Sequence, residues 1–159
     1  MRRTLSIILL LTQLAFLSGM GKVPLLFSNK NCSLCGREVH EDMAANLTFK
    51  DGESATACCL ECAMRYEAQT GKRAKDISVT DFYSAKVIDS KNAFFVTGSN
   101  LSPCCKKDIM RAPEGQALYL KYDRCLPSII AFEKKEDAMK YMTEHGGTSK
   151  TLSEIRESK

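Results

Sequence analysis

The residues best suited to chemistry in this chain are its eight cysteines. Two C-x2-C pairs stand out, Cys32/Cys35 and Cys59/Cys62, and Cys58 directly precedes the second pair. Such a pair directs two sulfur atoms at one ion about 2.3 Å away, and two pairs at this separation are typical of a tetrahedral thiolate site. We therefore predict one metal site formed by Cys32, Cys35, Cys59 and Cys62, with Cys58 as an alternative ligand and structural zinc as one interpretation.

A second cysteine group lies in the later part of the chain. Cys104 and Cys105 are adjacent, and adjacent cysteines rarely bond to each other because a disulfide strains the single peptide unit between them. Two neighbouring thiolates suit a soft ion of low coordination number, such as Cu(I) or Hg(II). We predict an exposed transfer site at Cys104 and Cys105, helped by Cys125 or Met110. Two separate disulfides, one of them to Cys125, remain the alternative.

Other soft donors are few. Met43 lies in a predicted loop near the first cysteine pair, and His40 lies beside it, so both are candidate ligands. Met64, Met139 and Met142 lie on the apolar faces of predicted helices, which favours a role in core packing.

Two functions without metal transport also fit the cysteines. Cys59 and Cys62 lie where a strand meets a helix N-terminus, which lowers thiol pKa values and suits a thiol–disulfide oxidoreductase. A purely structural domain stapled by cysteines is the other alternative. The sequence has no G-x-S-x-G, no glycine-rich phosphate loop and no H-E-x-x-H motif, so we expect a protein that is not an enzyme.

The first residues indicate export. Residues 1–19 have two arginines, a thirteen-residue apolar run and small residues at its end, which predicts a signal peptide and a periplasmic or otherwise exported protein. An uncleaved N-terminal anchor is the alternative, and it is the only membrane contact that we expect. Without this segment the net charge falls from +4 to +2, and so small and even a charge excludes nucleic acid as a partner.

Hydrophobic periodicity predicts an α+β fold of two similar small ββα-type halves. The stretch 63–66 resembles 138–141, and Gly71 then corresponds to Gly146. Strands are expected at 46–50, 54–58, 77–82, 93–97, 117–122 and 128–132, and helices at 60–70 and 133–145. The predicted order is a signal peptide (1–19), a linker (20–31), an N-terminal cysteine-rich half (32–75), a C-terminal half (76–147) and a polar tail (148–159).

Two family resemblances join these observations. The first cysteine cluster resembles the heavy-metal-binding treble-clef modules of the TRASH type over about thirty residues. Most of 32–147 resembles the NosL-type accessory proteins of nitrous oxide reductase. The matching stretches are Cys32-x2-Cys35-Gly36, Val79–Ser99, Ile129–Glu133, Glu136–Ala138 and His145–Gly147.

The NosL resemblance implies an exported protein that delivers Cu(I) to a copper enzyme, with a fold similar to the non-catalytic part of organomercurial lyases. The chain departs from that family in its cysteines: Met20 stands where a lipidated cysteine is usual, and Cys104-Cys105 stands where Met-Gly is common. We therefore expect a divergent Cu(I) chaperone or accessory factor whose partner is a metalloenzyme or a metal-transport protein.

Overall fold

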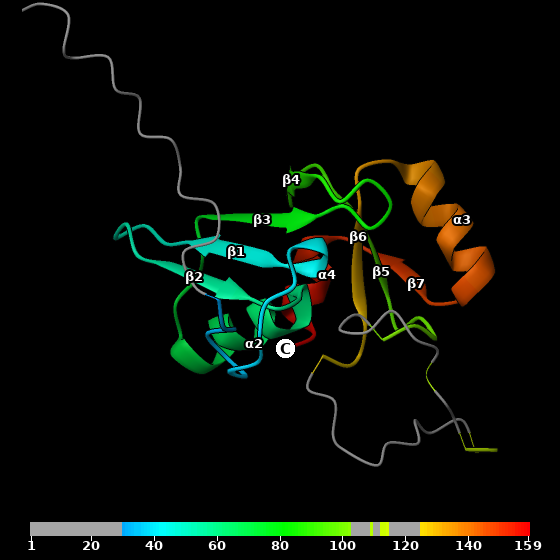
Figure 1. The fold of residues 1–159 in the computed structure, drawn as a ribbon, viewed down its shortest axis with the longest axis horizontal. Coiled ribbons are helices and arrows are strands. Elements are labelled where there is room, and N and C mark those ends of the chain that lie inside the picture. Colours follow the sequence, from blue (N-terminus) through cyan, green and yellow to red (C-terminus); the bar gives the residue numbers. More distant parts are fainter. Residues whose placement is uncertain (1–29, 103–108, 110–111, 115–124) are drawn as a thin grey trace, which may run out of the picture.

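Two antiparallel sheets form the framework of the protein (Figure 1). The computed structural model describes residues 30–102, 109, 112–114 and 125–159. The first sheet has the order β2-β1-β3-β4, with β1 at Ala45–Thr48, β2 at Ser54–Ala57, β3 at Asp76–Thr80 and β4 at Val87–Asp89. The second has the order β6-β5-β7, with β5 at Phe94–Thr97, β6 at Ile129–Phe132 and β7 at Thr148–Lys150. The predicted α+β class is confirmed.

The first hairpin forms as the sequence predicts. Leu47 is fully buried while the next residue, Thr48, is exposed, which is the alternation of a strand with one face on the core. Gly52 has a φ of 86°, and the Asp51 carboxylate accepts a hydrogen bond from the Glu53 amide across the turn. β1 and β2 therefore pair in a register that carries the chain back towards the cysteines after Ala57.

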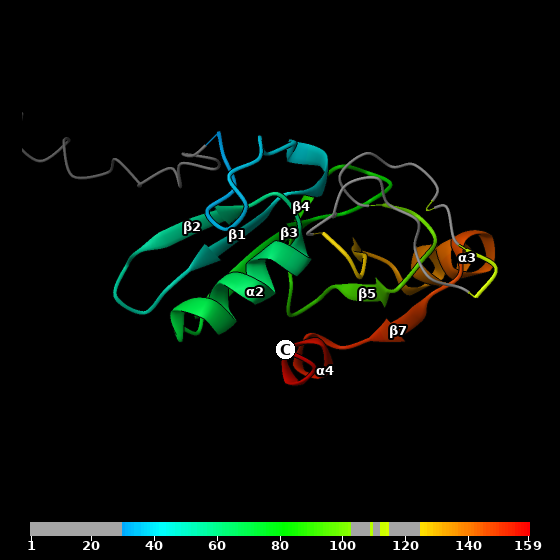
Figure 2. The ribbon, with the colours of Figure 1, turned by 90° about the horizontal axis from the view of Figure 1, so that it is seen from below.

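Helix α2 (Leu60–Thr70) covers one face of this sheet, as Figure 2 shows. Its predicted bounds are confirmed, and it ends at Gly71, which has the left-handed φ of 67° that favours glycine. Ala63 and Met64 are buried against the sheet. The helix therefore fixes its N-terminal cysteines relative to the sheet core.

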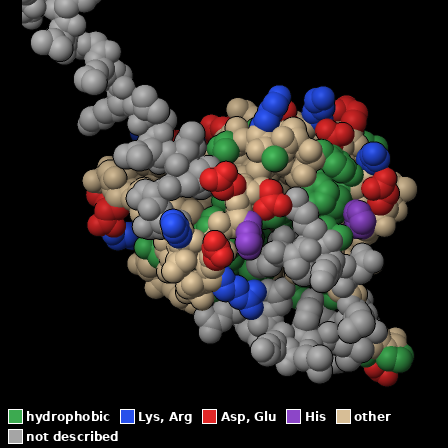
Figure 3. Space-filling view, viewed as in Figure 1, with side chains coloured by type: hydrophobic (Ala, Val, Ile, Leu, Met, Phe, Trp, Pro, Cys, Tyr) green, Lys and Arg blue, Asp and Glu red, His purple; other side chains and the backbone are tan. Residues whose placement is uncertain are grey.

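The second sheet packs against α3 (Lys135–His145) around aromatic side chains. Phe132 and Tyr141 are fully buried with ring centroids 5.1 Å apart, and Phe82 lies 5.1 Å from Tyr141. Tyr83 and Met139 stay largely exposed, and Figure 3 shows apolar surface on the side where α3 lies. The aromatic core leaves this part of the fold with packing of its own.

The two sheets meet at the ends of β3 and β6. Asp81 forms a parallel bridge with Ala131, and the Phe82 amide donates to the Ala131 carbonyl at 3.0 Å. The Asp81 carboxylate also accepts from the Glu133 amide at 2.7 Å. This buried carboxylate therefore ties the end of β6 to the first sheet.

The C-terminal residues differ from the predicted polar tail. Residues 148–159 contain β7, which pairs with β5, and α4 (Leu152–Glu157). Thr151 and Glu154 form a capping box, Ile155 is buried and Leu152 packs partly against the core. Ion pairs from Arg156 to Glu67 and from Lys159 to Glu61 also dock this mostly polar segment. β3 and β4, which follow the predicted boundary at 75/76, belong to the first sheet, where β3 pairs with β1 and with β4.

Two expectations concern parts of the chain that the structure leaves undescribed. The signal peptide (1–19) and the strand at 117–122 both lie outside the described residues. Among the helices that are described, none has the length and apolar character needed to cross a bilayer.

Candidate metal centre

The first cysteine pair lies on a turn that is fixed to β2. The Cys32 amide donates to the Arg37 carbonyl at 2.7 Å, and Gly36 closes the turn with a φ of 72°. The Ser33 amide donates to the Thr56 carbonyl at 2.8 Å, and the Thr56 amide donates to the Ser33 hydroxyl at 3.3 Å. These reciprocal bonds place the pair beside the residues that follow β2.

The second group stands at the N-terminus of α2. Cys58 follows β2, Cys59 is the N-cap residue, and Cys62 lies in the first turn. All three are buried, Cys59 and Cys62 completely. The positive end of the helix dipole favours thiolates here, because the first amide groups of a helix have no partner within it.

Cys125 reaches the same cluster from the other end of the sequence. Arg65 of α2 donates from Nη2 to the Leu126 carbonyl at 2.9 Å, which holds the segment after Cys125 against the helix. The Cys125 sulfur lies 3.8 Å from that of Cys58, and its side chain is fully buried. Cys125 therefore lies with the first cysteine group, although the sequence analysis assigns it to Cys104 and Cys105.

Six sulfur atoms thus converge. The Cys58 sulfur lies 3.6 Å from that of Cys35 and 3.6 Å from that of Cys62. No two of the six described cysteines are joined by a disulfide. Two sets of four have all their sulfur atoms within 4.8 Å of one another, namely Cys32, Cys35, Cys58 and Cys62, and Cys58, Cys59, Cys62 and Cys125. These soft donors fit a thiophilic ion such as Cu(I) or Zn(II).

The thiols differ in how readily they ionise. The pKa of Cys62 is lowered, first by the Cys125 thiol and then by Cys32, Cys58 and Cys59, which together outweigh the opposing effect of burial. The pKa of Cys35 is raised, chiefly by burial. Cys62, which belongs to both sets of four, therefore ionises more readily than an ordinary thiol and Cys35 less readily.

The structure places most of the predicted ligands but not all of them. It gathers Cys32, Cys35 and Cys62 with Cys58, the alternative ligand, and puts Cys59 in the second set. The predicted transfer site at Cys104, Cys105 and Met110 lies outside the described residues. Each assignment as a ligand stays a prediction. The position of Cys125 had no local signal, because it depends on how the loop before β6 returns to α2.

Glu61 is a buried residue that the sequence analysis did not single out. It lies between Cys59 and Cys62, it is fully buried, and its Oε1 accepts from Arg65 at 2.7 Å and from Lys159 at 2.6 Å. The signal was its place inside the C-x2-C motif at the start of a helix. Arg65 lies in the same helix, four residues on, whereas Lys159 ties the C-terminal segment to the start of α2.

One hollow opens next to the cluster. It has a volume of about 210 Å³ and is lined by Arg37, Glu38, His40, Met43 and Cys58. His40 is exposed, whereas Met43 is buried at the inner end of the short 3-10 helix Glu41–Met43. The hollow therefore offers an imidazole and a thioether beside the Cys58 thiol, and both are ligand types for Cu(I).

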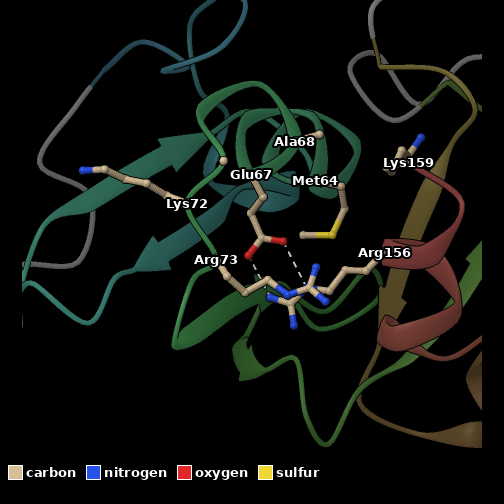
Figure 4. Close-up of a pocket in the computed structure, with 8 residues that line it drawn as sticks. Met64, Glu67, Ala68, Lys72, Arg73, Arg156 and Lys159 are labelled. Atoms are coloured by element: carbon tan, nitrogen blue, oxygen red, sulfur yellow. Dashed lines mark hydrogen bonds and ion pairs between the residues drawn. The ribbon is translucent and has the colours of Figure 1, made fainter.

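A second hollow, about 280 Å³, lies where α4 meets α2 and carries no thiol. Figure 4 shows the Glu67 carboxylate at its centre pointing towards Arg156. Arg156 donates to both Glu67 oxygens, at 2.9 and 3.0 Å, and the Ala74 amide donates to Oε1 at 2.7 Å. With Glu67 satisfied in this way, the hollow serves to dock α4 rather than to bind metal.

The chain was compared with known protein families, sequences and structures. No protein-family model matches the chain, and no curated protein sequence matches it. The fold does match a solved structure, that of the copper chaperone NosL from Shewanella denitrificans, with a TM-score of 0.59 and 19% sequence identity. The match covers 84% of this chain and 94% of that one. The resemblance in fold to NosL is thereby confirmed, and that protein is a copper chaperone rather than an enzyme.

Proposed function

We propose that this chain is an exported protein that binds Cu(I) through its cysteine cluster and passes it to a metalloenzyme or a metal-transport partner. Maturation of a copper enzyme such as nitrous oxide reductase is the specific role that we favour. The observation that carries the proposal is the convergence of six cysteine sulfurs, from three separate segments of the chain, within a NosL-like fold. Thiolates select soft ions, and Cu(I) is the softest common biological cargo.

The burial of the cluster suggests where exchange takes place. Cys59, Cys62 and Cys125 are inaccessible, whereas Cys35 is partly exposed and Cys58 lines the hollow with His40 and Met43. A partner's sulfur would approach from this side, and a new Cu–S bond would form as the bond to Cys35 or Cys58 breaks. The charge on copper stays +1 throughout, so no oxidant or reductant is needed.

Export is the second part of the proposal. The N-terminal segment with the features of a signal peptide supports it. In an oxidising compartment thiols tend to form disulfides, and a bound soft ion would protect the cysteines of the cluster from this oxidation. The predicted transfer site at Cys104 and Cys105 remains part of this proposal.

We further propose that the two sheets derive from a duplicated ββαβ unit. One unit would be β1, β2, α2 and β3, and the other β5, β6, α3 and β7. In each sheet the first strand of the unit lies between the second and the third, as the orders β2-β1-β3 and β6-β5-β7 show. α2 and α3 each have eleven residues, and each is followed by a glycine of positive φ. This correspondence in connectivity supports the predicted internal repeat.

The thiol–disulfide oxidoreductase gains no support from the geometry. Cys59 and Cys62 are both fully buried, and a dithiol that attacks other proteins must be accessible.

Cu(I) affinity under anaerobic conditions tests the function. A chromophoric Cu(I) chelator would compete with the wild-type chain, with Cys62→Ser and with Met139→Leu, a control at an exposed methionine on α3. We expect Cys62→Ser to lower the affinity by at least about 100-fold, because even supporting residues of metal sites cost 10–100-fold. Met139→Leu should leave it unchanged. Equal affinity of Cys62→Ser and the wild-type chain would contradict the proposal.

A further inference from the structure

The arrangement of the six cysteines carries more information than the presence of a metal site. The two sets of four sulfurs overlap in two members, Cys58 and Cys62. Cys32 and Cys35 belong only to the first set, and Cys59 and Cys125 belong only to the second. The arrangement therefore has room for two four-ligand sites that share an edge, with no cysteine left over.

The separations fit direct coordination. In a tetrahedral thiolate site with metal–sulfur bonds of about 2.3 Å, neighbouring sulfurs lie about 3.8 Å apart. The Cys58 sulfur lies 3.6 Å from Cys35, a member of the first set alone, and 3.8 Å from Cys125, a member of the second set alone. It also lies 3.6 Å from the other shared sulfur, that of Cys62. Cys58 is thus at bonding geometry to both positions.

A single ion would use this cluster poorly. Zn(II) and Cu(I) accept four thiolates at most, so one ion would leave two of the six thiols without a metal bond. Two ions that share two thiolates give every cysteine a bond and every ion four ligands. They also neutralise more of the negative charge that six thiolates would bring into a buried space.

We propose that the six described cysteines hold two thiophilic ions at adjacent positions, with Cys58 and Cys62 each bonded to both ions. The inference rests on the proposed function in so far as the cluster binds soft metal, and it adds the number of ions and the identity of the bridging ligands. Cys32 and Cys35 complete one position, and Cys59 and Cys125 complete the other. The position completed by Cys35 lies nearer the exposed side and would exchange its ion first.

Cadmium is the probe that tests this arrangement. The full-length chain with Cys104→Ser and Cys105→Ser keeps the six clustered cysteines, so every thiolate-bound ion belongs to them. We expect two Cd(II) per chain and two ¹¹³Cd resonances that are coupled to each other, because coupling between two cadmium nuclei passes through a shared sulfur. One resonance, or two without coupling, would overturn the two-ion site.

Matched variants sharpen the result. Cys35→Ser and Cys125→Ser should each weaken one position and leave the other resonance in place, whereas Cys58→Ser should weaken both positions. The coupling should disappear only when Cys58 and Cys62 are both replaced by serine, because either sulfur alone still bridges the two ions. If all three substitutions have the same effect on the spectrum, the assignment of separate and shared ligands is wrong. Because the coupled resonances are read on a chain with the whole cluster intact, the test stands even if a variant fails to fold.

The two proposals fail in different ways. One Cd(II) in a chain that still binds and releases Cu(I) overturns the two-ion site alone. Two coupled Cd(II) ions in a chain that does not bind Cu(I) support the two-ion site and overturn the proposed Cu(I) function.

Discussion

The junctions from β2 to α2 and from β6 to α3 have the same backbone layout but different residue types. Each has two residues between the strand and an eleven-residue helix, Cys58 and Cys59 in one and Glu133 and Lys134 in the other. The third helical residue is Cys62 in α2, where α3 has Asp137. The first junction is buried, whereas Glu133 and Lys134 are exposed.

Matching positions of α2 and α3 also differ in which side chains are buried. Met64 and Met139 both occupy the fifth position, but Met64 is 2% exposed and Met139 is 54% exposed. Tyr141 is fully buried, while Tyr66, at the same position in α2, is only partly buried. The second sheet thus gains stability from aromatic packing, whereas the core of the first sheet combines apolar side chains with the buried cysteines. The lesson is that a core built partly of thiols depends in part on what the thiols bind, whereas a core of rings does not.

Metal removal should separate the two regions most strongly. We expect a chelator to destabilise the first sheet by about 10 kcal/mol, since a structural thiolate site contributes folding free energy of that order. Hydrogen exchange followed by mass spectrometry, with and without metal, would show lost protection in β1, β2 and α2 and retained protection in α3. Equal protection of both regions in the metal-free chain would refute the comparison.

The aromatic core is the next target. Phe132→Ala removes a fully buried ring that packs on Tyr141, and we expect it to lower the free energy of unfolding by about 3–5 kcal/mol. Metal stoichiometry should not change, because the ring lies in the other core cluster. Urea unfolding of the metal-loaded chain measures the first quantity and metal analysis the second. Met139→Ala, at an exposed site, is the control.

The smallest effect should come from the link between the sheets. Burial alone would raise the pKa of Asp81, but hydrogen bonds from Ser84 and from the Glu133 amide lower it overall. We expect Asp81→Asn to cost about 1–3 kcal/mol at pH 7, since the lost bonds are to a charged acceptor.

The pH dependence of that link has a definite sign. Because the folded pKa lies below the unfolded one, the carboxylate contributes fully above the unfolded value of about 3.9 and loses this contribution as the pH falls through the folded value. The difference in unfolding free energy between the wild-type chain and Asp81→Asn should therefore shrink in acid. Thiolate ligation weakens equally in both chains, so the difference isolates Asp81. A difference that stays constant from pH 7 to pH 3 would show that the Asp81 charge is unimportant.

By itself the sequence determined the local elements. Apolar periodicity and Gly71 set the bounds of α2, and Asp51-Gly52 predicted the first hairpin, because such signals act over a few residues. The two C-x2-C motifs predicted most members of the cysteine cluster, because their spacing is also a local signal. The strands β4 and β7 escaped prediction, since three-residue strands at a sheet edge form only when a neighbouring strand offers its hydrogen bonds.

Only the tertiary structure decided how the cysteines are shared. Cys125 is sixty-seven residues from Cys58 in sequence, and it joins the cluster because Arg65 holds the Leu126 carbonyl against α2. Cys58 gains its central place because Ser33 and Thr56 fix the first cysteine turn to β2. Both facts depend on contacts between distant segments, and no spacing along one chain records them.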